Sequence, residues 1–408
     1  MSRKWLEKEA PGWVKQEIIN EAQANKLLAL YDERKHAAGL LPILGSILVT
    51  LGLLTFVAAN WQYISPGMRL AFLVIVMTGF YAGGEWLQRR GAEKLGIALT
   101  GIGVASFGGA LLLIYQTFHI MDYHVTAFLL WGIAAIVCAF VYRSGFLYVM
   151  AAVIVNAAQM YSLTSFNSFS IPVFAATLIG LGAYWWFHRK AWQAWLLGIA
   201  FLLQMLMLVI EREWHIVWFL APALLLYAAA DWLRDRQTAY PLQSSVLTAF
   251  FVFAALQLMI GGDMNHLQFK ANELVELLSF MAVVLAALVI SLTAKWRQQR
   301  KFSFSEWILL LPWFLLPVGA EVVSLLALCL FSLYLLADGY ALHWRFKINL
   351  GTGLFLFAVL LAYTRLAWRF MDKSLFFLIG GILLLLLSWL LHRRRQRALQ
   401  SEGGEQNA

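Results

Sequence analysis

Charged residues are scarce in this chain of 408 residues. Asp, Glu, Lys and Arg make up 13% of it, hydrophobic residues make up 62%, and the mean hydropathy is +0.72. A soluble domain contains roughly twice that share of charge. Apolar runs of 18 to 22 residues recur along the chain, and each is long enough to cross a bilayer as a helix. The composition therefore predicts a multi-pass integral membrane protein whose first partner is the lipid bilayer.

Cysteine is also scarce, and we expect no cleavable leader. The two cysteines, Cys138 and Cys329, fall inside apolar runs, so we expect two small buried side chains and neither a disulfide nor a metal site. The first 38 residues contain seven Lys or Arg and no apolar stretch of the kind that a signal peptide needs. We expect the N-terminus to stay where it is made.

Ionisable side chains are missing from the middle of the apolar runs. Glu85, Arg143, Asp231, Glu276 and Asp338 all lie within about two helical turns of a run's end, where we expect them to reach the headgroups. Ion-coupled pumps usually place charge inside the membrane, and a hydrolase needs a nucleophile beside a base. Both classes are disfavoured by this pattern, and we assign no catalytic residue and no cofactor.

The apolar runs predict an all-α, polytopic membrane helix bundle with about fourteen transmembrane helices. They are expected at residues 40–60, 68–88, 95–115, 124–142, 145–163, 170–187, 192–210, 215–233, 241–260, 274–293, 304–318, 320–340, 347–366 and 374–392.

The positive charges predict the orientation of these helices. With the N-terminus in the cytoplasm, 25 of the 31 Lys and Arg residues fall on the cytoplasmic side, as the positive-inside rule requires. We therefore expect both termini in the cytoplasm and the chain in the cytoplasmic (inner) membrane. The run at 304–318 contains Pro312 and Pro317, and the C-terminus would lie outside if this run re-entered the membrane without crossing it.

The chain divides into a cytoplasmic N-terminal helical hairpin (1–38), a transmembrane helical domain (39–392) and a basic, then polar, cytoplasmic tail (393–408). Asn20 and Gln23 have the spacing of a capping box, which predicts a helix starting near Glu21. The hairpin could dock a partner protein, or it could simply pack beneath the membrane domain. The basic residues follow the topology and form no patch interleaved with aromatics, so we expect no nucleic-acid partner.

Several short motifs occur in a recognisable order. The first long run ends in "FVAANW", a Gly-rich run continues into "IYQTFHI", "LLWGIAA" and "YRSG" follow, and "NLGTGLF" and "HRRRQR" come late. This order resembles the domain of unknown function 2157 family of predicted bacterial membrane proteins. The resemblance covers the N-terminal third well and the last 60 residues loosely. It implies a membrane location and no particular activity or site.

Glycine and alanine repeat at four-residue spacing in two consecutive runs. The residues are Gly79, Gly83, Gly101, Ala105 and Gly109. Although "GIGVASFGG" superficially resembles a phosphate loop, it has no preceding strand and no lysine. Small residues at this spacing instead predict that the two helices pack at close backbone distance.

Neutral amides gather in the half of the membrane predicted to face outward. The candidates for a polar cavity are Asn60, Gln116, Asn156, Gln159, Gln204 and Gln257. These amides could line a cavity for an uncharged polar ligand, or they could form hydrogen bonds between helices.

His and carboxylate residues also occur in the outward loops "HIMDYH", "EREWH" and "GGDMNH", but none has a constrained ligand spacing, so we assign no metal site. Transport, or the handling of lipid or envelope components through the polar cavity, is the favoured function. The alternative is a membrane scaffold or sensor that docks a partner through residues 1–38. A third hypothesis is an intramembrane transferase acting on lipid-linked substrates.

Overall fold

The structure is a computed structural model that describes residues 65–117, 125–260, 274–299, 304–316, 319–341 and 345–367, together with short pieces between residues 10 and 55 and residue 382. Every regular element in these ranges is a helix, as the sequence predicts. The chain forms two compact units, Met1–His188 and Arg189–Ala408, which are described separately. The predicted domain boundaries at residues 38 and 392 lie outside the described residues.

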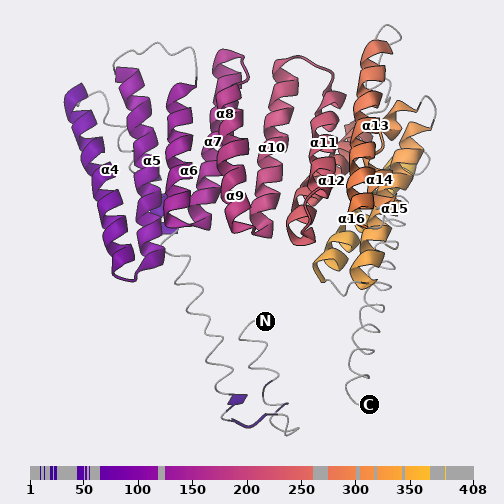
Figure 1. Cartoon of the computed structure of the whole chain (residues 1–408), viewed down its shortest axis with the longest axis horizontal. Coiled ribbons are helices and arrows are strands. Elements are labelled where there is room, and N and C mark those ends of the chain that lie inside the picture. Colours follow the sequence, from indigo (N-terminus) through magenta and orange to yellow (C-terminus); the bar gives the residue numbers. More distant parts are fainter. Residues whose placement is uncertain are drawn as a thin grey trace. The chain divides into compact units, whose positions relative to one another are not determined.

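The first unit contains a series of upright helices (Figure 1). Its elements are α4 (Pro66–Arg89), α5 (Glu93–Thr117), α6 (Thr126–Tyr142), α7 (Gly145–Phe166), α8 (Ile171–Ala175), the π-helical turn η2 (Ala176–Leu181) and α9 (Gly182–His188). Proline occupies the first position of α4, where its missing N–H leaves no hydrogen bond unmade. Ser144 caps the start of α7 by accepting a hydrogen bond from the backbone of Leu147. Local chemistry thus sets these helix ends.

Aromatic stacking fills the centre of the first unit. Tyr148 of α7 and Tyr184 of α9 are almost completely buried, and their ring centroids lie 4.7 Å apart. The ring of His188 stacks on the other side of Tyr184 at 4.1 Å, and its Nδ1 lies 2.8 Å from the Tyr184 carbonyl oxygen. Stacked rings of this size bury a large apolar area and hold α7 and α9 together.

The second unit is also built from helices, with one interrupted segment (Figure 1). Its elements are α10 (Ala191–Glu211), the 3₁₀ turn η3 (Ile216–Phe219), α11 (Leu220–Asp231), α12 (Arg236–Ile260), α13 (Leu274–Arg297), α14 (Phe304–Leu310), the 3₁₀ turn η6 (Trp313–Leu315), α15 (Ala320–Ala341) and α16 (Arg345–Ala367).

A single apolar core joins the helices of the second unit. Leu224 of α11, Phe280 of α13 and Leu328 of α15 are fully buried within it, and Trp307 of α14 packs edge-on against Tyr227 with the ring centroids 5.8 Å apart. Such a core excludes water from any polar side chain placed at its edge, which makes the pairing of those side chains important.

The expected count of fourteen transmembrane helices is wrong for the described residues. Nine helices in these ranges are long and apolar enough to cross a membrane. The expected runs at 124–142 and 215–233 form shorter apolar helices, Thr126–Tyr142 and Ile216–Asp231. The run at 304–318 is interrupted at Pro312, where α14 has already ended. The expected runs at 40–60 and 374–392 lie largely outside the described residues. The polytopic helix bundle is confirmed, with nine helices of spanning length among the described residues.

The predicted capping box near the N-terminus is confirmed. The Asn20 N–H donates to Gln23 Oε1 at 3.0 Å, and the Gln23 N–H donates to Asn20 Oδ1 at 2.8 Å. The described residues Glu21, Gln23 and Ala24 are helical. A helix begins here because the two side chains satisfy each other's backbone N–H groups.

Candidate functional site

Two helices of the second unit carry polar side chains four residues apart. Tyr227 and Asp231 lie on one face of α11, and Ser291 and Lys295 lie on one face of α13. Residues four apart are neighbours on a helix surface, so each helix presents a polar pair to the other. Both pairs lie toward the C-terminal ends of their helices, the end that also carries Arg234 and Arg297.

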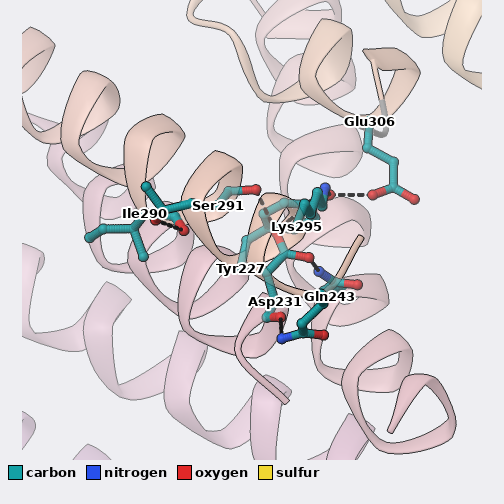
Figure 2. A network of polar contacts seen from close by, with 9 residues as sticks. Tyr227, Asp231, Gln243, Ile290, Ser291, Lys295 and Glu306 are labelled. Atoms are coloured by element: carbon teal, nitrogen blue, oxygen red, sulfur yellow. Dashed lines mark hydrogen bonds and ion pairs between the residues drawn. The ribbon is translucent and has the colours of Figure 1, made fainter. Parts of the chain in front are cut away.

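The Asp231 carboxylate is buried and fully engaged (Figure 2). Its Oδ1 accepts a hydrogen bond from Gln243 Nε2 of α12 at 2.7 Å. Its Oδ2 accepts one from Ser291 Oγ at 2.5 Å and lies 3.4 Å from Lys295 Nζ. Asp231 is 3% exposed and Lys295 is 5% exposed, so this ion pair is held away from solvent.

Tyr227 links the ion pair to a second carboxyl group. Lys295 Nζ donates to Tyr227 Oη at 3.4 Å, and the Tyr227 hydroxyl donates to Glu306 Oε2 of α14 in a short hydrogen bond. Figure 2 shows Lys295, Tyr227 and Glu306 pointing toward one another from three helices. The tyrosine therefore connects the ammonium group on α13 to the carboxyl group on α14.

A further ion pair joins α15 and α16. Lys347 Nζ lies 2.6 Å from Asp338 Oδ2 and 4.4 Å from the ring centre of Tyr240 on α12. The Lys347 side chain is 3% exposed, whereas that of Asp338 is 22% exposed. Lys347 also interacts electrostatically with Glu306. Glu306 therefore lies within electrostatic range of one lysine from each ion pair.

We call Asp231, Lys295, Glu306, Asp338 and Lys347 the charge cluster. It contains three carboxyl groups and two ammonium groups, so full ionisation leaves one net negative charge. The sequence led us to expect that Asp231 and Asp338 reach the headgroups. The burial of Asp231 and of both lysines corrects that expectation. Partners on neighbouring helices offset the cost of burying these charges. Which helices pair cannot be predicted from one apolar run considered alone.

The break after α14 follows from a single missing donor. In a continuous helix the Ile308 carbonyl would accept from the backbone N–H of residue 312, but that residue is proline. The Trp313 indole Nε1 instead donates to the Ile308 carbonyl oxygen at 2.5 Å. The helix ends here, and the chain continues through the short turn η6.

The residues on the two sides of the break lie toward opposite ends of α15. Glu306 and Asp338 both belong to the charge cluster, and Asp338 lies near the end of α15. α15 is 22 residues long, about 33 Å, and its first residue, Ala320, lies at its opposite end.

A small cavity lies beside this break. Its volume is about 20 Å³ and it is partly open. Its lining is predominantly apolar, with Gln257 and Ser324 as the polar side chains: Leu220, Phe250, Phe253, Ala254, Gln257, Leu309, Leu311, Trp313, Ser324, Ala327 and Leu328. Gln257 and Gln243 are fourteen residues apart on α12, or about 21 Å, so the cavity and the Asp231 end of the cluster lie at different heights.

The six amides that the sequence proposes for a cavity have different surroundings. Asn60 lies outside the described residues, and Gln116 lies in α5 with its side chain undescribed. Asn156 Nδ2 donates to the Ala152 carbonyl of its own helix at 2.8 Å. Gln204 is fully buried in α10, in the second unit. Gln257 lines the cavity beside the break.

Gln159 is fully buried and faces the backbone of Ser170, just before α8. In the amide orientation that satisfies both groups, it donates to the Ser170 carbonyl at 3.2 Å and accepts from the Ser170 N–H at 3.1 Å. This arrangement ties α7 to the start of α8 by hydrogen bonds.

The close approach of α4 and α5 occurs at Gly84 and Gly96. An added Cβ on Gly84 would lie 2.9 Å from the Gly96 carbonyl oxygen, and one on Gly96 would lie 2.7 Å from the Gly84 carbonyl oxygen. The sequence repeat placed this approach elsewhere. A Cβ on Gly79 would meet nothing within 4 Å, and one on Gly83 would make an ordinary contact of 3.7 Å.

The other members of the repeat belong to α5. Gly101 faces Phe146 of α7, whose Cε1 would lie 2.7 Å from an added Cβ. Ala105 is buried and Gly109 is partly buried. Small residues therefore admit α7 as well as α4 against α5.

Of the three polar loops considered for metal binding, the structure describes "EREWH". Glu211 pairs with the adjacent Arg212 at 3.0 Å, and His215 accepts a hydrogen bond from the backbone of Val217 at 3.4 Å. No group of three potential metal ligands occurs among the described residues. The other two loops lie wholly outside them.

Comparison with known proteins identifies a family for part of the chain. Residues 11–148 match the family described as Predicted membrane protein (DUF2157), which confirms the resemblance over this range. No curated protein and no solved structure matches the chain. The match ends within α7, so the charge cluster and the cavity lie outside it.

Proposed function

We propose that this multi-pass membrane protein transports a small uncharged molecule together with protons, and that the charge cluster binds the proton. The observation that carries the proposal is a cluster of five ionisable side chains packed between the helices of a membrane protein. Ionisable groups are costly inside a membrane domain and are retained there chiefly for the movement of ions or protons.

Charge balance points to Glu306 as the proton-binding residue. Asp231 and Asp338 each have a lysine partner, whereas Glu306 contacts the neutral hydroxyl of Tyr227. The charged groups that act on it are Lys295 from α13, Lys347 from α16 and Asp231 from α11. One proton on Glu306 makes the cluster neutral, and its release restores one negative charge.

The helix break after α14 supports a transport role. Broken helices commonly form the binding sites of transporters, because their free ends present backbone groups within the membrane. α14 carries Glu306 near its start and Leu309 of the cavity wall one turn later. A change at the charge cluster can therefore reach the cavity through a helix of seven residues.

Glu306→Gln tests the proposal, with Glu321→Gln as a matched control because Glu321 lies in the first turn of α15, outside the charge cluster. Cells that express each form at equal membrane levels are compared by untargeted mass spectrometry of their solutes. We expect a solute shift that depends on the wild-type protein and disappears with a protonophore and in Glu306→Gln but not in Glu321→Gln. Transport is contradicted if wild type produces no shift, and proton coupling is contradicted if the shift survives the protonophore or Glu306→Gln.

The orientation is part of this proposal. The distribution of Lys and Arg supports both termini in the cytoplasm, which places the charge cluster at the cytoplasmic ends of the helices, in the cytoplasmic membrane. Reporter fusions at the two termini measure this directly, since phosphatase is active outside the cytoplasm and green fluorescent protein inside it. An external C-terminus would contradict the orientation.

A further inference from the structure

Gln257 is a buried amide whose Nε2 donor meets no acceptor in the part of the chain that the structure describes. The residue is 8% exposed and lies in the wall of the cavity beside the α14 break. Its Nε2 has no hydrogen-bond partner among the described residues. Buried amide groups nearly always have partners, since leaving one unpaired forfeits its hydration without return. An unpaired donor on a residue in the wall of a cavity marks a place where an acceptor oxygen would be stabilised.

The walls of the cavity restrict what that acceptor can belong to. Phe250, Phe253 and Trp313 provide aromatic surface, and Leu220, Leu309 and Leu328 provide aliphatic surface. No charged side chain lines the cavity. A charged ligand would lose its hydration here without gaining a counter-charge, whereas an apolar frame with one oxygen acceptor would match the walls and Gln257 together.

We propose that this cavity is the binding site for an uncharged molecule that presents an acceptor oxygen to Gln257 Nε2 and an apolar frame to the aromatic walls. This proposal deepens the proposed function, on which it rests, by naming the chemical class of the transported molecule. Ser324 of α15 supplies a second polar group at the same site.

The cavity is too small for such a molecule unless one wall moves, and Trp313 is the wall that can move. A volume of about 20 Å³ admits roughly one water-sized group. Trp313 both lines the cavity and supplies the indole N–H that caps Ile308. Because Pro312 removes the backbone alternative, movement of the indole widens the cavity and frees the end of α14 in one step.

Thiol labelling of the full-length protein tests the site without knowledge of the natural ligand. In a background with C138A and C329A, Ser324→Cys places a thiol in the cavity wall. Ser332→Cys is the control, because Ser332 is also buried (0% exposed, against 5% for Ser324), lies on the same helix two turns away and does not line the cavity. The probe is methyl methanethiosulfonate, an uncharged molecule with sulfonyl oxygens on a small apolar frame, and its charged counterpart is sulfonatoethyl methanethiosulfonate.

We expect the uncharged probe to label Ser324→Cys at least about tenfold faster than Ser332→Cys, and faster than the charged probe does. Adding Gln257→Leu should slow the uncharged probe at Ser324→Cys, because the donor for its oxygens is lost. Far-ultraviolet circular dichroism and thermal unfolding verify that each variant is folded.

Equal labelling of the two cysteines would overturn the site, and equal labelling by the two probes would overturn the uncharged class. If Gln257→Leu left the labelling rate of Ser324→Cys unchanged, Gln257 would not belong to the binding site. These outcomes are independent of proton coupling at Glu306, which the solute assay measures, so failure of the site and failure of the proposed function are distinguishable.

Discussion

Buried polar side chains in the first unit bond mainly to nearby backbone, whereas the second unit adds a set that bond to one another and carry charge. Gln159 faces the Ser170 backbone and Asn156 donates to its own helix, while Asp231 meets side chains from two other helices. Polar side chains of the first unit join neighbouring segments by hydrogen bonds, whereas the second unit gathers charged side chains in the charge cluster. The family match covers only part of the first unit. It therefore bears on the helix packing there and not on the charge cluster.

Removing the buried ammonium group should have the largest effect. We expect Lys295→Met to lower the free energy of unfolding by about 3–5 kcal/mol, because it leaves the Asp231 carboxylate without its counter-charge. Arg297→Met is the control, since Arg297 is exposed on the same helix and contacts the Trp232 ring at 5.4 Å. Unfolding in mixed micelles measures both. A double variant with Asp231→Asn should recover part of the loss, and equal stability of Lys295→Met and wild type would contradict a structural ion pair.

The closest helix contact of the first unit should show the next largest effect. Gly84→Ala or Gly96→Ala forces α4 and α5 apart, because each added methyl group meets a backbone carbonyl oxygen. Overpacking of this kind costs about 1–3 kcal/mol. Gly79→Ala and Gly83→Ala serve as controls on the same helix, and both should be neutral or slightly stabilising. The same unfolding assay measures these variants. If Gly79→Ala destabilised the protein as much as Gly84→Ala, the observed contact face of α4 would be contradicted.

The smallest of the three effects should come from the neutral amides. Gln159→Leu leaves the Ser170 backbone N–H and carbonyl without their side-chain partner and should cost about 1–3 kcal/mol, toward the lower end of that range. Asn156→Leu should cost less, because the Ala152 carbonyl keeps its helical hydrogen bond and the buried Asn156 Oδ1 has no partner to lose. If the order of the two variants is reversed, Asn156 has a role beyond its own helix.

Hydropathy predicted where the helices lie better than which of their faces meet. Nine expected runs are helices of membrane-spanning length, and the two prolines in the run at 304–318 indicated its interruption. The doublet Gly83–Gly84 shows the limit. Adjacent residues differ by about 100° around a helix, so a repeat beginning at Gly79 selects Gly83, whereas packing against α5 uses Gly84.

The charge cluster was missed for a related reason. The positions of Asp231 and Asp338 near the ends of their apolar runs predicted their depth in the membrane. That depth alone suggested contact with the lipid headgroups. Whether such a residue faces lipid or another helix depends on rotation and pairing, which come from the tertiary structure. A usable signal was present in the four-residue spacing of Tyr227 with Asp231 and of Ser291 with Lys295, two polar pairs on otherwise apolar helices.

The short helix α6 has a consequence for the surrounding lipid. Its 17 residues span about 26 Å, less than the roughly 30 Å of a typical hydrocarbon core. Leu130, Ile133, Val137 and Val141 form an exposed apolar face along it, each between 44% and 67% exposed. Lipid beside this face must shorten to match it, and hydrophobic mismatch of this kind carries an energy that grows with bilayer thickness. Bilayer thickness thus becomes a variable that acts on the first unit through α6, whereas α4 and α5, with 24 and 25 residues, are long enough for a typical core.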